Sequence, residues 1–356
     1  MSTHRDGSVE DLSIRTGNRK WGDSLAQESK KITFGVRIPV EGWVPISTPS
    51  PDFTYFLRLA QTAERLGYDF ILVADHLLNW IGSTPKKAAS TQYLALGTYE
   101  SWTTLSALAA VTEKVKLSNI VLCNLFRAPS LLAKMASTLD IISGGRFVLS
   151  MGAGWLREEC RRYGLDWFPY EERIERLREG LQVIRKLWTE KRADFLGKHY
   201  RLENAVLEPK PITKPHPPIW LGGASDSIMR IVAEEGNGWD LGLAGSPEAV
   251  KARIDRMNEY CDKISRRADS IKLSHSCMVV LSDTKDCAVN LVKAKARDLN
   301  TTMESFMGRH LVGSPSHIAS RMNEYVDVGV RHFTLYFDRD LRNLDRFASE
   351  VIPQVG

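Results

Sequence analysis

Two patterns of hydrophobic and polar positions alternate along the chain from residue 32 onward. Short runs rich in β-branched and aromatic residues predict buried strands, and longer segments with an apolar residue every three or four positions predict amphipathic helices. The predicted strands span 32–39, 70–74, 115–122, 146–151, 218–221, 239–243, part of 271–281, and 332–337. The predicted helices span 53–67, 101–112, 129–142, 171–188, 225–235, 247–264, 285–300 and 315–328.

This alternation of strands with helices predicts an α/β fold. Helical crossovers between strands require a parallel sheet that is buried on both faces. Eight strands in about 320 residues favour a closed (β/α)8 TIM barrel over an open doubly wound sheet. The open sheet is the alternative, and the absence of a GxGxxG motif between the first strand and its helix weakens it. The segments 76–99, 190–217 and 284–311 interrupt the rhythm, and we expect them to be insertions, the first and last of which form the pocket.

The N-terminal segment, the apolar runs and the cysteines indicate how the chain is divided into domains and where the protein is located. The first 30 residues are polar and lack the apolar core of a signal peptide, so we expect 1–30 to form a flexible N-terminal arm ahead of a single barrel domain at 31–356. No apolar run approaches the roughly 18 residues that a membrane-spanning helix needs. The five cysteines include no CxxC pair, which is typical of free thiols in a reducing compartment. The sequence therefore predicts a cytoplasmic protein without a membrane partner.

Composition and charge narrow the classes of partner. Hydrophobic residues make up 43% of the chain and charged residues 26%, which is ordinary for a globular protein. The net charge of +5 comes without a dense Lys/Arg block, so we expect no nucleic-acid partner and favour an anionic small molecule. The histidines and carboxylates do not cluster at ligand spacing, and a GxSxG motif is absent, so neither a metal site nor a serine nucleophile is predicted.

Candidate catalytic residues follow the second predicted strand, in the stretch FILVADHLLNW at 70–80. In a parallel barrel the loops after the C-terminal strand ends converge on one mouth, where catalytic groups lie. Asp75 and His76 fall at such an end, and Trp80 lies four positions beyond the histidine. We expect the strand to be scaffold and the Asp-His pair to line the pocket. The alternative is that Asp75 caps a short helix and His76 is a solvated loop residue.

Two glycine-containing segments follow later strands. GGAS at 222–225 lies between a strand and a helix, where small residues and free N–H groups suit a phosphate. GAGW at 152–155 places glycines beside Trp155, where the backbone can lie close to a flat ring system. For GGAS the alternative is ordinary turn chemistry. For GAGW it is a loop that leads into an exposed helical turn, which is the interpretation we favour for Glu158, Arg161 and Arg162.

Four longer segments together resemble one known family. They are LLAKMASTLDIISGGRFVLSMGAGW at 131–155, EERIERLREGLQVIRKLW at 171–188, FLGKHYRLENAVLEPKP at 195–211 and PPIWLGGAS at 217–225. These motifs, in order within residues 32–340, resemble the bacterial luciferase-like superfamily of flavin- and deazaflavin-dependent oxidoreductases. The resemblance implies a (β/α)8 barrel with insertions, a homodimer, and FMN or coenzyme F-420 bound at the C-terminal mouth.

The resemblance also implies which residues contact the cofactor. Asp75 and His76 match the position where the second strand meets the ring, and Gly223 and Ser225 match the phosphate cradle. Other implied contacts come from a third-strand bulge that backs the ring, often through a non-proline cis bond, and from the fourth strand and the segments after it. These residues are Ile120, Val121, Leu122, Ser150, Gly154, Glu159 and Arg173.

Two subgroups of the superfamily compete. DHLLNW resembles the Asp-His-x-x-x-Trp pattern of F-420-dependent sugar-phosphate dehydrogenases, in which the histidine is an acid or base and the tryptophan borders the substrate. Those enzymes carry a glutamate where this chain has Trp155. FMN-dependent two-component monooxygenases share IPVEGWVPIS-like openings and the GGAS cradle but lack the Asp-His pair, and they imply a separate flavin reductase. The choice between FMN and F-420 stays open, and we expect Trp80 and Trp155 to line a partly aromatic substrate pocket.

The sequence thus predicts an oxidoreductase that performs hydride transfer or monooxygenation on a small organic substrate. We expect His76 to give or take a proton near the site of hydride transfer, with Asp75 orienting its imidazole. The alternative from a different class is a flavin-binding accessory or storage protein without turnover. Such a protein would lack ionisable groups at the mouth, and Asp75 and His76 argue against it.

Overall fold

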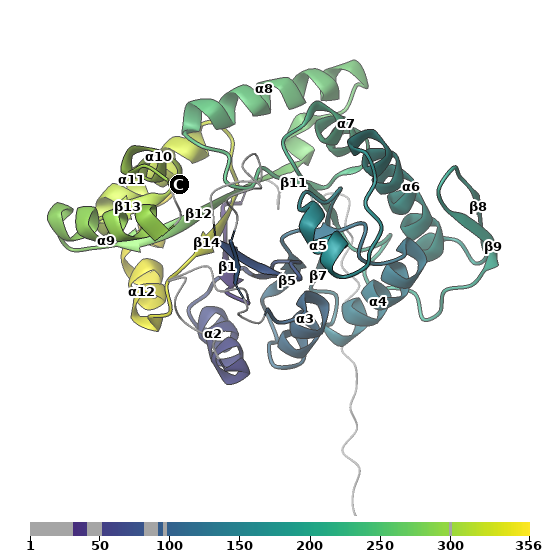
Figure 1. The fold of residues 1–356 in the computed structure, drawn as a ribbon, viewed down its shortest axis with the longest axis horizontal. Helices are drawn as coiled ribbons and strands as arrows, with labels where there is room; N and C mark the ends of the chain where they lie inside the picture. The colour runs from purple at the N-terminus through teal and green to yellow at the C-terminus, as the bar shows by residue number, and fades with distance from the viewer. Residues whose placement is uncertain (1–30, 41–51, 82–91, 95–97, 299–300) are drawn as a thin grey trace, which may run out of the picture.

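Eight parallel strands close into a ring at the centre of the molecule (Figure 1). The computed structural model describes residues 31–40, 52–81, 92–94, 98–298 and 301–356, so the predicted arm at 1–30 lies outside it. Around the ring the order is β10-β11-β12-β14-β1-β2-β5-β7, and β7 pairs again with β10, which closes the barrel. The strands are β1 (Thr33–Ile38), β2 (Phe70–Val73), β5 (Lys116–Asn119), β7 (Phe147–Gly152), β10 (Ile219–Gly222), β11 (Gly238–Asp240), β12 (Lys272–Leu281) and β14 (His332–Tyr336).

Helices follow the strands and surround the ring (Figure 1). They are α2 (Phe53–Arg65), α3 (Ser101–Ala110), α4 (Pro129–Ile142), α6 (Tyr170–Thr189), α7 (Asp226–Glu235), α8 (Pro247–Lys263), α11 (Pro315–Asp327) and α12 (Leu341–Arg346). Short 3-10 or π turns occupy Ala268–Ser270, Phe347–Val351 and Ile352–Gln354. The predicted (β/α)8 TIM barrel is therefore confirmed. None of these described helices has the length and apolar character needed to cross a lipid bilayer.

Several elements interrupt the regular strand–helix rhythm. β8 (Ala193–Leu196) and β9 (Arg201–Ala205) form an antiparallel hairpin that extends outward beyond α6 (Figure 1), which confirms the interruption predicted at 190–217. After β2, β3 (Asn79–Ile81) and β4 (Gln92–Leu94) pair in the same antiparallel way. Between β12 and α11 lie α9 (Lys285–Asp298), α10 (Met303–Arg309) and β13 (Leu311–Gly313), of which the sequence patterns predicted only the first.

Aromatic rings and one imidazole fill the interior of the barrel near the N-terminal ends of its strands. Side chains alternate across each strand, so that Ile71 packs outward against the helices and Phe70 points inward. Inside, Phe70 meets the His332 ring at a centroid distance of 4.6 Å, and Trp220 meets the same ring at 5.2 Å. These three rings occupy the barrel floor, and the opposite, C-terminal end, where the active sites of such barrels lie, is called the mouth below.

Candidate active site

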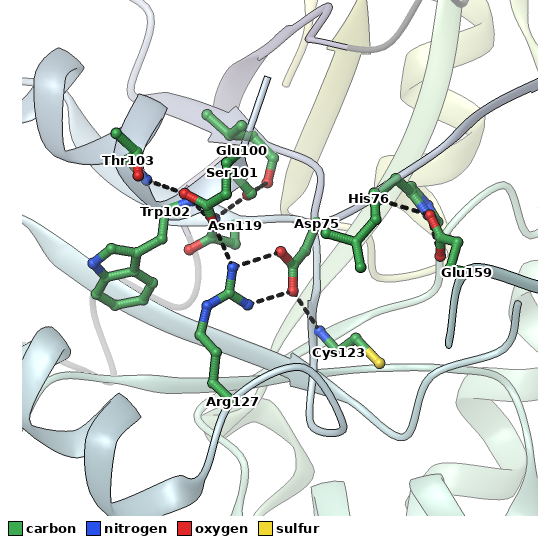
Figure 2. A network of polar contacts seen from close by, with 12 residues as sticks. Asp75, His76, Glu100, Ser101, Trp102, Thr103, Asn119, Cys123, Arg127 and Glu159 are labelled. Atoms are coloured by element: carbon green, nitrogen blue, oxygen red, sulfur yellow. Dashed lines mark hydrogen bonds and ion pairs between the residues drawn. The ribbon is translucent and has the colours of Figure 1, made fainter. Parts of the chain in front are cut away.

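Asp75, immediately after β2, forms a buried ion pair at the mouth (Figure 2). Arg127 donates from Nη1 to Oδ2 over 2.8 Å and from Nη2 to Oδ1 over 3.0 Å, and the Cys123 backbone N–H donates to Oδ2 over 2.9 Å. Arg127 also bonds Glu100, whose carboxylate caps the first turn of α3 through the Trp102 and Thr103 amides. Asp75 therefore holds the end of β2 against the segment that leads into α4, and it does not cap a helix.

Glu159, and not Asp75, orients the His76 imidazole (Figure 2). The Nδ1 atom of His76 lies 3.1 Å from each carboxylate oxygen of Glu159. The same carboxylate accepts the backbone N–H groups of Leu77 at 2.8 Å and Leu78 at 3.2 Å. The expectation that Asp75 performs this role is wrong, because both of its oxygens are bound by Arg127 and Cys123.

Glu159 reaches His76 from α5 (Arg157–Arg162), the short helix that follows β7. Its side chain is only 3% exposed, against 16% for His76. When Nδ1 donates its proton to Glu159, the imidazole lone pair lies on Nε2, and that nitrogen is the proton-accepting atom. Trp155 stands with its ring edge-on to His76 at a centroid distance of 5.6 Å, so the predicted catalytic residue and the predicted pocket residue are neighbours.

The segment after β5 brings two more strands together at the mouth. The peptide bond between Ile120 and Val121 is cis, as the family resemblance implied. The Val121 methyl groups occupy the space beside two glycines, because a Cβ placed on Gly152 or Gly222 would lie 2.7–2.8 Å from them. Ile120 packs on the inward-facing apolar cluster, and Leu122 begins β6 (Leu122–Cys123), which pairs with β7. The ends of β7 and β10 thus approach this segment without intervening side chains.

Ser150, Gly154 and Arg173 lie around the end of β7. Ser150 is buried on the inward face of the strand, in step with Val148. Gly154 has a φ of +77°, and a Cβ there would lie 2.7 Å from the Cys123 sulfur. Arg173 on α6 donates to the Gly154 carbonyl oxygen, and its guanidinium lies 4.1 Å from the Trp167 ring centroid. Arg173 therefore fixes the loop after β7, and burial lowers the pKa of its guanidinium.

The GGAS segment forms an open helix N-terminus. Ser225 is the N-cap of α7, and its hydroxyl accepts the Ile228 amide and contacts the Tyr170 hydroxyl. Gly223 is exposed and has a φ of +133°, a conformation that side chains strongly disfavour. Asp226 follows, and its carboxylate oxygens accept hydrogen bonds from Nε and Nη2 of Arg256. The Gly223 N–H donates to the Asp240 carbonyl oxygen, so the glycine contributes space, and the first amides of α7 fit a phosphate group.

One predicted site residue cannot be placed fully, and several residues that the structure brings to the mouth were not predicted. The Trp80 backbone lies in β3, but its side chain falls outside the part of the chain that the structure describes. Arg127 and Glu100 were not predicted, because nothing local marks their pairing with Asp75. Arg37 and Asp240, also at the mouth, had a usable signal, since each is a charged residue inside an apolar strand. Within the described residues, no group of three or more histidine, cysteine or acidic side chains has the geometry of a metal site.

Comparison with known proteins places this geometry in a family. The model of the luciferase-like monooxygenases matches residues 32–301. The chain belongs to that family. An FMNH(2)-dependent dimethylsulfone monooxygenase of Pseudomonas putida is 28% identical, with 92% of this chain and 96% of the relative aligned. The pyrimidine monooxygenase RutA of Stutzerimonas stutzeri (strain A1501) is 30% identical over 90% of this chain and 95% of its own length.

Comparison with solved structures agrees with the barrel fold. An F420-dependent secondary alcohol dehydrogenase, crystallised with an F420-acetone adduct, superposes with a TM-score of 0.74. The match covers 92% of this chain and 99% of that chain at 20% sequence identity. At this identity the likeness establishes the fold alone.

Proposed function

We propose that the chain is an oxidoreductase that binds FMN or coenzyme F-420 at the mouth and acts on a small organic substrate. One observation carries the proposal: three separate parts of the chain meet there in complementary roles. They are the His76–Glu159 pair, the Ile120–Val121 segment packed against Gly152 and Gly222, and the cradle of Gly223 and Ser225. The relatives named above use FMNH(2) or F420, which supports both cofactors and does not separate them.

The chain's own residues would bind and orient the cofactor. The first amides of α7 bind its phosphate through N–H groups and the helix dipole, and Gly223, which has no side chain, leaves room for it. Val121, set between Gly152 and Gly222, offers a flat apolar surface to one side of the ring. When bound, the cofactor supplies hydride transfer and, in the case of reduced FMN, reaction with dioxygen.

His76 would move the proton. Glu159 fixes the imidazole through Nδ1, so Nε2 gives or takes a proton at the reacting atom of the substrate. Asp75 acts on the site only by holding the strand end, because its carboxylate is bound by Arg127. Trp155 borders His76 and restricts the substrate from that side.

The family relationship also suggests the partners of the protein. With FMN as cofactor, a separate flavin reductase would supply the reduced form, and we propose the homodimer that the resemblance implies. All five cysteines are free thiols, which supports a cytoplasmic location. Storage of flavin without turnover is the weaker proposal, since the mouth carries the ionisable His76–Glu159 pair.

Turnover assays test the proposal and separate its two versions. The FMN version predicts oxygen consumption when an external reductase supplies reduced FMN and a small organic substrate is added. The F-420 version predicts oxygen-insensitive change in the F-420 absorbance. Neither signal with any substrate, from protein that holds its cofactor firmly, would favour the storage role and contradict the proposed enzyme.

A further inference from the structure

The segment that carries His76 has no regular secondary structure of its own. Residues 74–78, between β2 and β3, form neither helix nor strand. The backbone N–H and carbonyl groups of such a segment must find partners outside a helix or a sheet ladder. Whether the His76 imidazole stays in one place therefore depends on what binds this backbone.

Glu159 supports the segment through its N–H groups. The carboxylate accepts the amides of Leu77 at 2.8 Å and Leu78 at 3.2 Å, and both amides donate to the same oxygen, Oε1. It also contacts the His76 imidazole, so one buried carboxylate meets three consecutive residues. All of these contacts come from a single group on α5.

Tyr163 supports the same segment through a carbonyl group. Its hydroxyl donates to the Leu77 carbonyl oxygen over 2.9 Å. The peptide group between Leu77 and Leu78 is thus held at its oxygen by Tyr163 and at its N–H by Glu159. Because a peptide group is planar, holding it at both ends fixes its orientation.

Tyr163 is itself held at the end of α5. Its N–H donates to the Glu159 carbonyl oxygen over 3.0 Å, so the two side chains leave the helix one turn apart. Gly164 follows with a φ of +67°, and the Leu165 N–H donates to the Cys160 carbonyl oxygen over 2.9 Å, a common way for a helix to end at glycine. The Tyr163 hydroxyl therefore projects from a fixed point, although the residue is 55% exposed.

We infer that Tyr163 is a positioning residue that works with Glu159 to fix the His76 imidazole at the mouth. Glu159 alone leaves the segment free to rotate about one carboxylate, and the Tyr163 hydroxyl adds a second, separate point of attachment. Misplacement of a reacting group by about 1 Å can lower turnover by about 100-fold. The effect on turnover rests on the proposed function, in which His76 moves the proton.

Tyr163→Phe removes the hydroxyl and keeps the ring, and two measurements on the full chain without cofactor or substrate report its effect. Amide hydrogen exchange at Leu77 and Leu78 should become roughly 3- to 10-fold faster, because the segment loses one hydrogen bond. In nitrogen-15 NMR spectra at mildly alkaline pH, the two ring nitrogens of wild-type His76 should give widely separated resonances, since Glu159 holds the proton on Nδ1. That separation should narrow in Tyr163→Phe, and the spectrum of His76→Ala identifies the resonances.

Tyr68 supplies the matched control. Its hydroxyl also donates to a leucine carbonyl oxygen over 2.9 Å, but the acceptor is Leu344 on α12. Tyr68→Phe should therefore leave the amide exchange at Leu77 and Leu78 and the His76 resonances unchanged. In the oxygen-consumption or F-420 absorbance assay, Tyr163→Phe should lower kcat by roughly 3- to 10-fold, with KM and cofactor affinity little changed, and Tyr68→Phe should leave kcat as it is.

The outcomes separate the inference from the proposed function. Unchanged exchange in Tyr163→Phe would overturn the positioning role. Faster exchange with unchanged His76 resonances, or with unchanged kcat, would mean that the hydroxyl supports the backbone only, and would overturn its role toward the imidazole. A wild type without turnover would count against the proposed function instead, because the exchange and the resonances are measured without cofactor or substrate.

Discussion

Among single residues, two adjacent glutamates on α5 lie in opposite environments. Glu159 is buried and accepts hydrogen bonds from His76, Leu77 and Leu78. Glu158 lies on the outer side of the same helix and pairs with Arg161 and Arg162. Neighbouring helix positions point about 100° apart, so one carboxylate meets the mouth and the other meets solvent.

Replacing His76 tests the proposed proton transfer. His76→Ala should leave cofactor affinity largely unchanged, because the phosphate cradle and the ring-backing segment remain intact. Turnover should fall by about 10²–10⁴-fold, the usual contribution of general acid–base catalysis. Steady-state kinetics and cofactor titration of the same preparation measure the two effects, and unchanged turnover would remove His76 from the mechanism.

Replacing Glu159 tests the orienting role. Glu159→Gln weakens charge-assisted bonds to one ring nitrogen and two amides, so the free energy of unfolding should fall by about 1–3 kcal/mol and turnover should fall with it. Glu158→Gln is the control, with little change in either quantity. Denaturant unfolding and kinetics decide the comparison, and equal behaviour of the two variants would contradict the orienting role.

At the scale of elements, the ion pair of Asp75 with Arg127 joins β2 to the segment before α4. The two side chains are 1% and 11% exposed. Removing one partner from such a pair leaves the other charge buried. Asp75→Asn or Arg127→Met should therefore lower the free energy of unfolding by about 3–5 kcal/mol. The double variant should cost less than the sum, and strict additivity in a double-mutant cycle would show that the pair is not coupled.

Sequence patterns identified the strands and helices but not the contacts between distant side chains. They placed Asp75 and His76 correctly at a strand end, because hydrophobic periodicity marks the strand itself. The partners of these two residues lie 52 and 83 positions away, and periodicity carries no information on which distant side chains meet. Only the family resemblance pointed to Glu159, and neither pattern nor resemblance pointed to Arg127.

At the scale of the whole molecule, an eightfold count of strands was enough to predict closure. The count is informative because a parallel sheet with helical crossovers is buried on both faces. Eight tilted strands can close such a sheet into a barrel. The insertion after β12 was predicted only in part, since α10 and β13 are too short to give a periodic signal. Arg37 in β1 and Asp240 in β11 are charged residues within apolar strands, which the sequence shows. Whether they face the barrel interior or the helices becomes clear only in the closed barrel.

Three buried histidines should make the free energy of unfolding depend on pH. Burial lowers the pKa of His275 to about 4, that of His310 to about 3, and that of His332 well below 6.5. Below pH 6.5 the unfolded chain binds protons that the native state does not, so stability falls as pH falls from 6.5 toward 4. Each histidine should cost roughly 1 kcal/mol by pH 5.5. Guanidinium unfolding at pH 7.5 and 5.5 measures the loss, and a flat profile would contradict it.

A titration of the purified chain with FMN and with F-420 tests the cofactor site at the mouth most directly. We expect one of them to bind at one per chain. Binding should be weaker in Gly222→Ala, because the added Cβ would lie 2.7 Å from the Val121 side chain. Gly308→Ala, where a Cβ meets nothing within 4 Å, should bind as the wild type does. Failure of the wild type to bind either cofactor, or undiminished binding by Gly222→Ala, would contradict a cofactor site at the mouth.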